Sequence, residues 1–533
     1  MATSSFSMVR ILLLLVCFIS IVETAKYLFY STDNGSSGFN AKFVANALAT
    51  RGHDVTFVVP EEISNLFDDD AENTYKLIKV KGGYPEEFYL AFKDAIATAA
   101  LQGKLNDAFI DLSKLIIPPI RRYKTALFNN SELMKQLRNQ TFDLAFFEDL
   151  NIEFGHIANA IKVPYVLMGQ MLTNPYMAWL IRAQRNPSYH PGDLLDFDQH
   201  MDFIQRLQST IENIKGFLSY YILVLMTEVS SEYLQMNKPT SQLCMEAELI
   251  FVRTHFALDF PRLLPPHVIP MGGLMARPIQ PLNEDLDAFI RQSGHHGTII
   301  FNFSTYMSVM TNEQANIFIN AFSRLKQHVI MKYKDETKLT LPDNVRSMKW
   351  IAQNDLLGHT STRLFISHCG CNGAFEALYH AVPIICIPLF HDQFAIAQRI
   401  VSKGIGTKLD IVGLTSDRLE GAISHMLKNQ SYQDSINHLS AIYRDDLQTP
   451  IERVVYWMEF LVRHGGAKHL RSSAYDLNMF QYHLLDVYLV LIIITIAAIF
   501  VVLKFAKFVY QTLIKCKKVW SEREYYSTKK KPE

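Results

Sequence analysis

The chain has 533 residues, which is too long for one hydrophobic core and predicts at least two domains. Hydrophobic residues make up 49% of the chain and charged residues 20%, a composition typical of globular rather than disordered proteins. Basic and acidic residues number 52 each, so the charge of the whole chain gives no support for a nucleic-acid partner.

The chain begins with an apolar segment. Residues 8–22 carry one arginine followed by an apolar run, and Glu23, Thr24 and Ala25 come next. This pattern is typical of a secretory signal, so we expect residues 1–25 to be removed. The alternative is an N-terminal membrane anchor, but the run is shorter than the ~20 residues that a span needs.

Strand and helix patterns alternate after the signal. Residues 26–31 are an apolar run, residues 39–51 have a helical pattern, and residues 54–60 are rich in β-branched residues. The stretches 142–149 and 163–169 repeat the strand pattern around a short helix. Such β-α-β units build parallel sheets with helices on both faces, so a first doubly wound domain is expected here.

A second series of the same kind follows a proline-rich linker at 257–285. Residues 170–240, which lack clear strand patterns, are interpreted as an insertion in the first domain. The second series has strand patterns at 298–304, 328–333, 346–351, 362–368 and 382–388, with helical patterns at 311–326 and 372–380. The predicted fold class is therefore α/β, with two doubly wound domains.

The C-terminal region predicts a membrane span. Residues 487–503 contain no charge, and with Phe505 and Ala506 they form a segment, 487–506, long enough to cross a bilayer. The tail at 507–533 is rich in lysine, which predicts a cytosolic tail and a luminal body. The final KKPE resembles a dilysine retrieval signal of endoplasmic reticulum membrane proteins, and ordinary positive-inside charge is the alternative.

The cysteines and sequons agree with a luminal body. Without Cys17 and Cys516, the cysteines that remain are too few for a disulfide-built fold, and a Cys369–Cys371 bridge would be strained. Sequons lie at Asn34, Asn129, Asn139, Asn302 and Asn429. We expect glycans on Asn129 and Asn139, and none on Asn302 because it lies in a strand pattern. The triplet 68–70 is acidic, and we interpret it as a solvated loop rather than a metal site.

The segment 367–373, SHCGCNG, brings a histidine close to two cysteines. A zinc site needs four ligands, and no second pair stands at a regular spacing; nothing in the sequence requires a catalytic cysteine either. The segment instead joins a strand pattern to a helix pattern through a glycine turn, and such a helix N-terminus binds anions, typically phosphate. Glu376 lies on the same helix face as Asn372, where it would reach a ribose hydroxyl.

Three stretches then resemble one family. Residues 349–393 read KWIAQNDLLGHTSTRLFISHCGCNGAFEALYHAVPIICIPLFHDQ, and residues 253–274 and 464–487 are similar to the same proteins. These are the UDP-glycosyltransferases, including the membrane-bound glucuronosyl- and glucosyltransferases of animals. The resemblance covers nearly the whole chain.

The resemblance implies the GT-B arrangement, in which two Rossmann-like domains face a cleft. Residues 26–265 would bind the acceptor, residues 266–455 the UDP-sugar, and residues 456–486 would form returning helices before the membrane segment. The expected location is the endoplasmic reticulum membrane, with a single span of type I.

The resemblance also implies site residues. Trp350 would stack on uracil, Gln353 would support the base or ribose, and Glu376 would bind the ribose hydroxyls. Core packing is the alternative for Trp350, and a capped core histidine is the alternative for His368. The full expected set is Ser304, Trp350, Gln353, His368, Gly370, Asn372, Gly373 and Glu376 for UDP, and His391, Asp392 and Gln393 for the sugar.

The implied reaction is inverting hexosyl transfer without a metal or other cofactor. The helix tip and His368 would stabilise charge on the leaving UDP. The acceptor hydroxyl must lose a proton, which in the family is accepted by a histidine that an aspartate orients. Here Ser37 occupies the histidine position and Glu148 the acid position, and serine is not a base near neutral pH. Tyr306 and Ala352 also depart from the family pattern.

Two functions therefore remain open from the sequence. The first is a membrane-bound UDP-hexosyltransferase that conjugates small lipophilic acceptors with glucuronic acid or glucose. The second is a relative that binds UDP-sugar or a lipophilic ligand without efficient turnover, because the base is missing. The expected partners are the donor, the acceptor and the membrane, and a homo-oligomer is left open.

Overall fold

The computed structural model describes residues 24–32, 35–68, 75–81, 86–103, 117–118, 120–183, 185–229, 238–303, 310–333, 340–390 and 392–528. The chain divides into two compact units, residues 1–470 and 471–533. Residues 1–23 of the predicted signal, together with Ser304, Tyr306 and His391, lie outside the described residues.

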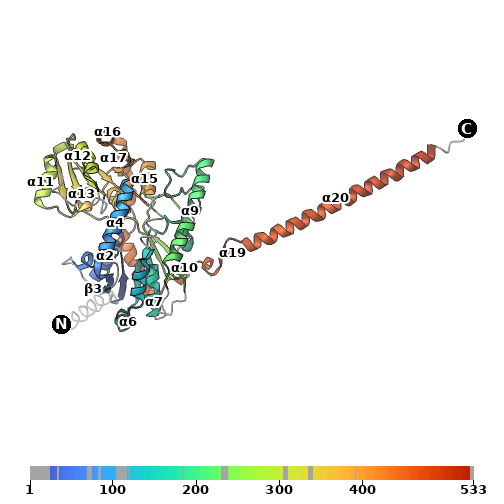
Figure 1. The fold of residues 1–533 in the computed structure, drawn as a ribbon, viewed down its shortest axis with the longest axis horizontal. Helices are drawn as coiled ribbons and strands as arrows, with labels where there is room; N and C mark the ends of the chain where they lie inside the picture. Colours follow the sequence, from blue (N-terminus) through green and yellow to red (C-terminus); the bar gives the residue numbers. More distant parts are fainter. Residues whose placement is uncertain are drawn as a thin grey trace, which may run out of the picture. The chain divides into compact units, whose positions relative to one another are not determined.

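The first sheet is parallel, with strand order β3-β2-β1-β4-β5-β6-β7. Figure 1 labels its edge strand, β3. The strands predicted from the sequence are present, and β3, β6 and β7 were not predicted. β6 and β7 have three residues each, which is too short for a recognisable pattern. The strands are β1 (Lys26–Tyr30), β2 (Asp54–Pro60), β3 (Lys76–Val80), β4 (Leu144–Glu148), β5 (Tyr165–Gly169), β6 (Ile250–Val252) and β7 (Val268–Pro270).

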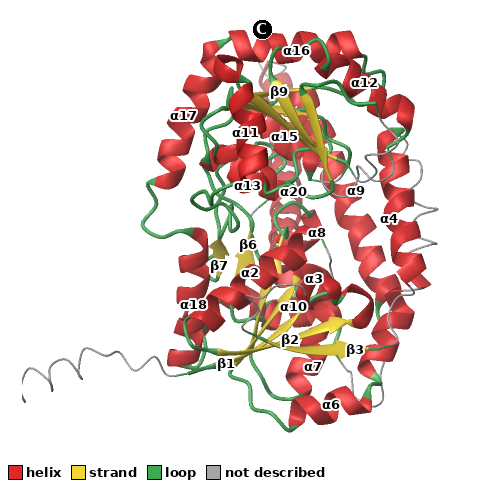
Figure 2. Ribbon diagram, turned by 90° about the vertical axis from the view of Figure 1, so that its left-hand side faces the viewer, coloured by secondary structure: helices red, strands yellow, loops and turns green. Residues whose placement is uncertain are grey.

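Helices cover both faces of this sheet. The region 170–240, predicted as an insertion without strands, contains two helices and no strand among its described residues. The helices are α2 (Ser36–Thr50), α3 (Asn65–Asp68), α4 (Glu86–Leu101), α6 (Ser131–Arg138), α7 (Gly155–Ala160), α8 (Pro175–Leu180), α9 (Phe203–Thr227) and α10 (Thr240–Glu246). Figure 2 shows this sheet with the second sheet above it.

The second sheet is also parallel, with strand order β10-β9-β8-β11-β12-β13. Its strands are β8 (Thr298–Asn302), β9 (His328–Lys332), β10 (Val345–Met348), β11 (Thr362–Ser367), β12 (Ile384–Cys386) and β13 (Gly406–Lys408). Its helices are α11 (Glu284–Gln292), α12 (Asn312–Phe322), α13 (Gln353–Gly358), α14 (Cys371–Tyr379), α15 (Gln393–Ser402), α16 (Ser416–Lys428) and α17 (Gln430–Arg444). Two doubly wound sheets were predicted, and this part of the prediction is confirmed.

The first unit has two halves, one built around each sheet, and two features hold them together. The helix α18 (Pro450–His464) follows the second sheet in sequence, yet it buries Val454 and Met458 in the core of the first sheet. At the same time, Arg399 of α15 donates a hydrogen bond of 2.6 Å to Asp259, and both side chains are buried. Because a buried charge without its partner is costly, this ion pair favours one arrangement of the two halves.

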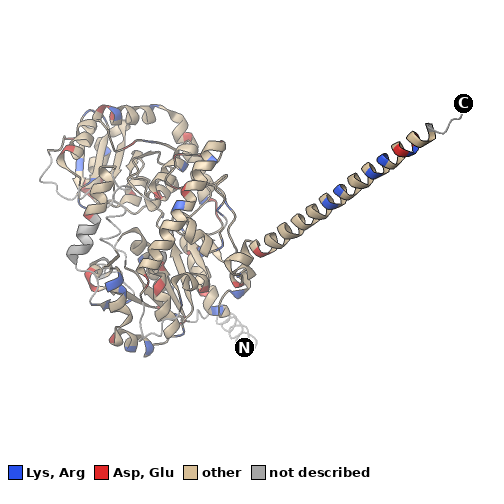
Figure 3. Ribbon diagram, turned by 45° about the vertical axis from the view of Figure 1, so that its right-hand side comes forward, with Lys and Arg blue, Asp and Glu red and all other residues tan. Residues whose placement is uncertain are grey.

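The second unit contains α19 (Met479–Tyr482) and the long helix α20 (Leu485–Thr528). Among the described residues, α20 is the helix long and apolar enough to cross a membrane, and the predicted span 487–506 lies within it. Figure 3 shows that lysine and arginine lie in the second half of this helix, after its uncharged stretch.

Candidate active site

The turn between β11 and α14 organises the candidate site. β11 ends at Ser367, and α14 begins at Cys371 with Gly370 as its N-cap residue. A Cβ atom on Gly370 would lie 2.6 Å from Nε2 of His368, so only glycine lets the imidazole lie against the turn. The first N–H groups of a helix have no acceptor within the helix, so this turn presents donors to an anion.

His368 is a neutral imidazole at physiological pH. Burial lowers its pKa to about 4, and a hydrogen bond to the backbone of Asn302 opposes that shift. A neutral imidazole donates one N–H bond and carries no charge. His368 therefore lies at the turn without a charge, and a phosphate bound there would compete with the backbone of Asn302 for its one N–H.

Glu376 lies in α14 and is buried. Gln353, at the start of α13, donates a hydrogen bond to its carboxylate, and Asn302, at the end of β8, donates to the amide oxygen of Gln353. Burial raises the pKa of Glu376 to about 7, although the bond from Gln353 opposes that shift. The structure therefore brings together three polar side chains from three elements beside the turn.

Trp350 lies at the surface rather than in the core. Its side chain is 61% exposed, the Nζ atom of Lys332 lies 4.7 Å from its ring centroid, and the ring of Phe39 lies 5.7 Å away. Since Phe39 belongs to α2, the indole lies where the two halves of the unit meet. The core-packing alternative for Trp350 is thus wrong, and its face is available for stacking on a ring.

Asp392 and Gln393 follow β12. Gln170, the residue after β5, donates a hydrogen bond of 2.9 Å to Asp392. The amide oxygen of Gln393 accepts from the backbone N–H groups of Leu389 and Phe390, at 2.8 and 3.1 Å. Gln393 therefore stabilises its own loop through its oxygen, and its amide nitrogen is the atom suited to bind a ligand hydroxyl.

Ser37 and Glu148 have separate hydrogen-bond partners. Ser37 is buried at the start of α2, and its hydroxyl accepts a bond of 3.2 Å from Arg253. Glu148, at the end of β4, is fully buried and accepts bonds from Ser31 at 3.1 Å and Asn151 at 3.3 Å. The position expected to hold a base is thus a serine beside a guanidinium, and a guanidinium does not lose its proton at neutral pH.

Arg253 is the residue that the sequence analysis missed. It follows β6, and its Nε atom is buried without a hydrogen-bond partner within the described residues. The stretch 253–274 entered the sequence argument only through its family resemblance, because the strand before Arg253 was not predicted. The arginine places a fixed positive charge in the region where the two halves meet.

Direct contacts join the two halves at this site. Asn40 of α2 and Asn372 of α14 exchange hydrogen bonds between their side-chain amides, at 3.3 and 3.4 Å. The bond between Gln170 and Asp392 also crosses between the halves. The predicted donor residues and the predicted catalytic serine therefore lie on facing elements.

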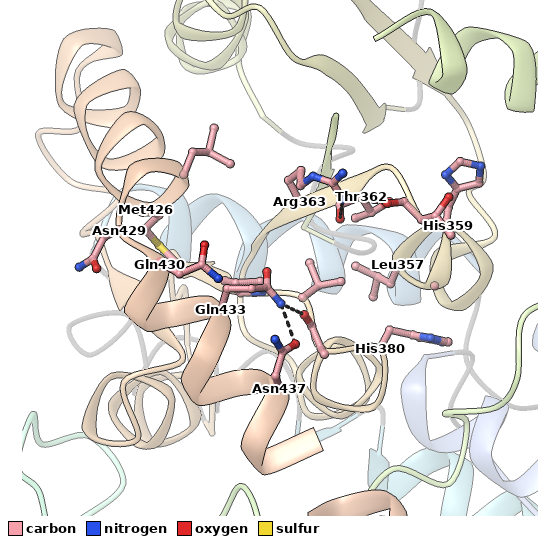
Figure 4. Close-up of a pocket in the computed structure, with 16 residues that line it drawn as sticks. Leu357, His359, Thr362, Arg363, His380, Met426, Asn429, Gln430, Gln433 and Asn437 are labelled. Atoms are coloured by element: carbon pink, nitrogen blue, oxygen red, sulfur yellow. Dashed lines mark hydrogen bonds between the residues drawn. The ribbon is translucent and has the colours of Figure 1, made fainter. Parts of the chain in front are cut away.

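A cavity of about 410 Å³ lies elsewhere in the second half. It is lined by residues such as Arg363, His380 and Gln433 (Figure 4), and none of the predicted site residues lines it. Its lining includes Thr362, the first residue of β11, and Pro383, the residue before β12. The β11–α14 turn lies at the opposite, carboxyl end of β11. The cavity is therefore separate from the candidate site.

Comparison with known proteins gives a consistent result. A family model described as "UDP-glucoronosyl and UDP-glucosyl transferase" matches residues 25–519. The chain is 32% identical to human UDP-glucuronosyltransferase 1A8 over 91% of this chain and 92% of that one. It is 31% identical to rabbit (Oryctolagus cuniculus) UDP-glucuronosyltransferase 2C1 over 90% of this chain and 97% of that one.

Solved structures support the fold. The spinosyn forosaminyltransferase SpnP matches with a TM-score of 0.56 and 15% identity, covering 83% of this chain and 100% of that one. The calicheamicin glycosyltransferase CalG4 matches with a TM-score of 0.54 and 16% identity, covering 83% of this chain and 99% of that one. These neighbours are glycosyltransferases with the GT-B arrangement.

Glu376→Gln tests the role of the buried carboxylate. Because hydrogen bonds to charged groups contribute about 1.5–3 kcal/mol, the variant should bind UDP about tenfold more weakly in calorimetry. The variant should also be more stable than the parent above pH 7, because the folded parent must bury a charge there. This gain in stability should vanish below pH 4.5, the ordinary pKa of a glutamate, because the carboxyl group is then neutral in both the folded and the unfolded protein.

Glu132 is an exposed residue of α6, and Glu132→Gln is the matched control. It should change neither the UDP affinity nor the pH dependence of stability. Unchanged UDP affinity in folded Glu376→Gln protein would remove Glu376 from the site.

Proposed function

The chain belongs to the UDP-glucuronosyl and UDP-glucosyl transferase family, and from this premise we propose that it is an inverting, metal-independent UDP-hexosyltransferase for small lipophilic acceptors. The observation that carries the proposal is the β11–α14 turn, where free helix N–H groups, a neutral histidine and a buried carboxylate converge. The relatives' names favour glucuronic acid as the sugar, with glucose as the alternative.

In this proposal the second half binds the donor. The diphosphate accepts hydrogen bonds from the N–H groups of Cys371–Gly373 and from His368, while Glu376 accepts bonds from the ribose hydroxyls. The exposed face of Trp350 stacks on uracil, and Asp392 and Gln393 bind the sugar hydroxyls. The donors around the phosphate gain strength as negative charge develops on the leaving UDP, so the proposal needs no metal ion.

The first half would bind the acceptor. Aromatic side chains from α8 and α9 pack together beside the loop that follows β5, with Tyr176 and Trp179 each 5.3–5.9 Å from the ring of Phe217. Tyr176 belongs to the core, and Trp179 and Phe217 are partly buried against it, so these rings would form an apolar wall suited to a lipophilic acceptor. Proton removal from the acceptor would fall to Glu148, acting through water, because Ser37 is not a base.

A specific contact also supports a second candidate function. Ser37 accepts a hydrogen bond from Arg253, so neither residue supplies a base at neutral pH. A protein with an intact donor half and this acceptor half would bind UDP-sugar with little turnover.

The test uses the full-length protein with UDP-glucuronic acid or UDP-glucose and a panel of phenols, alcohols and amines. We expect UDP release that depends on the acceptor, a product with inverted anomeric configuration by NMR, and the same rate in EDTA. UDP binding without acceptor-dependent release would favour the second function, and a rate abolished by EDTA and restored by a divalent ion would contradict the metal-independent mechanism.

Ser37→His tests the missing base. General-base catalysis is typically worth ~10²–10⁴-fold, so a histidine here should accelerate transfer to an alkyl alcohol, provided that Glu148 orients the ring. Transfer to a matched amine should change much less, because an amine needs less proton removal in the transition state. The measurement is kcat/KM for both acceptors in both proteins.

Ser36→His, one residue earlier in α2, is the control for adding an imidazole. If the parent protein already transfers to alcohols at ordinary enzymatic rates and Ser37→His changes nothing, another residue is the base.

We also propose that the protein spans the endoplasmic reticulum membrane once, with its body in the lumen. The apolar half of α20 and the basic half after it support this orientation. The exposed side chains of Asn129 and Asn139 suit luminal glycosylation.

In addition, α9 exposes a stripe of apolar side chains that would favour a lipid surface: Ile204, Leu207, Ile211, Ile214, Leu218 and Leu225.

The orientation predicts a pattern of protease protection. Protease added to sealed microsomes should remove only the tail after the span, and detergent should then expose the body to digestion. An antibody against the body and one against the tail distinguish the two fragments. Digestion of the body in sealed vesicles would reverse the proposed orientation.

A further inference from the structure

We propose that a disulfide between Cys369 and Cys386 is a positioning element of the donor site, because it holds the β11–α14 turn in the conformation that aims its N–H groups at the diphosphate. The inference rests on the proposed donor role of this turn. The two cysteines are bonded, with their Cα atoms 5.5 Å apart and a separation of 17 positions in sequence. The sequence analysis considered only Cys369 with Cys371 and missed this pair.

The turn needs such a constraint because of its backbone. Cys369 has a φ of 61°, in the left-handed region. A residue with a Cβ atom populates this region roughly five- to thirtyfold less than the right-handed one, whereas glycine populates both. A cysteine here would relax toward other conformations unless something holds it, and the disulfide provides that restraint.

The bond also connects two loops of the site. Ser367 and Cys386 are paired in register between β11 and β12, and the N–H of Ile387 donates to the carbonyl of Ser367 at 2.8 Å. Beyond β12 the chain continues to Asp392 and Gln393, the proposed sugar-binding residues. The disulfide thus fixes the phosphate-binding turn to the strand that leads to the sugar-binding loop.

The surroundings favour a stable bond. Cys369 and Cys386 are fully buried, so solvent reductants do not reach them in the folded protein. Cys371, in the same turn, keeps a free thiol whose pKa burial raises to about 12. Since the thiolate is the species that attacks a disulfide, Cys371 does not exchange with the pair near neutral pH.

Two double variants separate turn geometry from simple loss of a cross-link. Cys369→Ala with Cys386→Ala removes the bond and leaves a Cβ atom at the left-handed position. Cys369→Gly with Cys386→Ala removes the same bond but lets the backbone keep its conformation. Cys244→Ala, which removes a buried cysteine of α10 that lies outside the disulfide, is the control. Each full-length protein is measured for UDP affinity by calorimetry, for thermal stability, and for hydrogen exchange of the amides at 371–373.

We expect the two double variants to lose similar thermal stability. The alanine pair should bind UDP about tenfold more weakly than the parent, in line with the cost of the left-handed conformation, and its turn amides should exchange faster. The glycine-containing pair should recover most of the affinity and protection. Peptide mapping of the unreduced parent should find Cys369 and Cys386 linked, and Cys244 and Cys371 open to alkylation after denaturation.

Three results would overturn the inference. The first is free thiols at Cys369 and Cys386 in the unreduced parent, and the second is unchanged amide exchange and UDP affinity in the alanine pair. The third is an equal loss of UDP affinity and of amide protection in both double variants. The exchange measurement does not require UDP. If the parent fails to bind UDP while the alanine pair still loses turn protection, the proposed function fails and the positioning role of the disulfide stands.

Discussion

The left-handed turn between β11 and α14 is the constraint on which the rest of the site depends. It reverses the chain within a few residues, so that the N-terminus of α14 lies at the carboxyl edge of the second sheet. Parallel sheets gather their loops at this edge, and here Asn302, Gln353 and Glu376 form a hydrogen-bonded chain beside it. The close contact between Gly370 and His368 shows how little space the turn leaves for any other residue.

The sequence predicted the local structure around the β11–α14 turn because each signal there was local. A strand, a glycine and a helix adjacent in sequence remain adjacent in space, so the position of His368 and Glu376 could be read from spacing. The contacts that the sequence analysis missed join distant segments. Arg253 reaches Ser37, Cys386 pairs with Cys369, and no pattern within either segment specifies its partner. The short strands β6 and β13 were missed for a related reason, since three residues do not establish a period.

The two halves differ in what their polar groups can do. In the donor half, burial keeps His368 neutral and leaves Glu376 near its point of half-ionisation at neutral pH. Under the proposed function, a UDP-sugar would bring phosphate acceptors to His368 and hydroxyl donors to Glu376. In the acceptor half, Glu148 is already satisfied by Ser31 and Asn151, and Ser37 by Arg253. Glu148 and Ser37 therefore have hydrogen-bond partners within the protein, whereas Glu376 carries a cost of burial that a ligand would offset under the proposed function.

This difference determines how binding and turnover depend on each other. Buried polar groups that lack their best partners cost stability, and such costs persist in proteins where a ligand offsets them. The raised pKa of Glu376 reflects a cost of this kind, since burial disfavours its charged form although Gln353 donates to it. Near Ser37 the cost lies on Arg253, whose Nη2 donates to the serine hydroxyl while its Nε atom is buried without a hydrogen-bond partner within the described residues. Catalysis through Glu148 would therefore require its carboxylate to give up a hydrogen bond from Ser31 or Asn151, whereas donor binding as proposed needs no such exchange at Glu148.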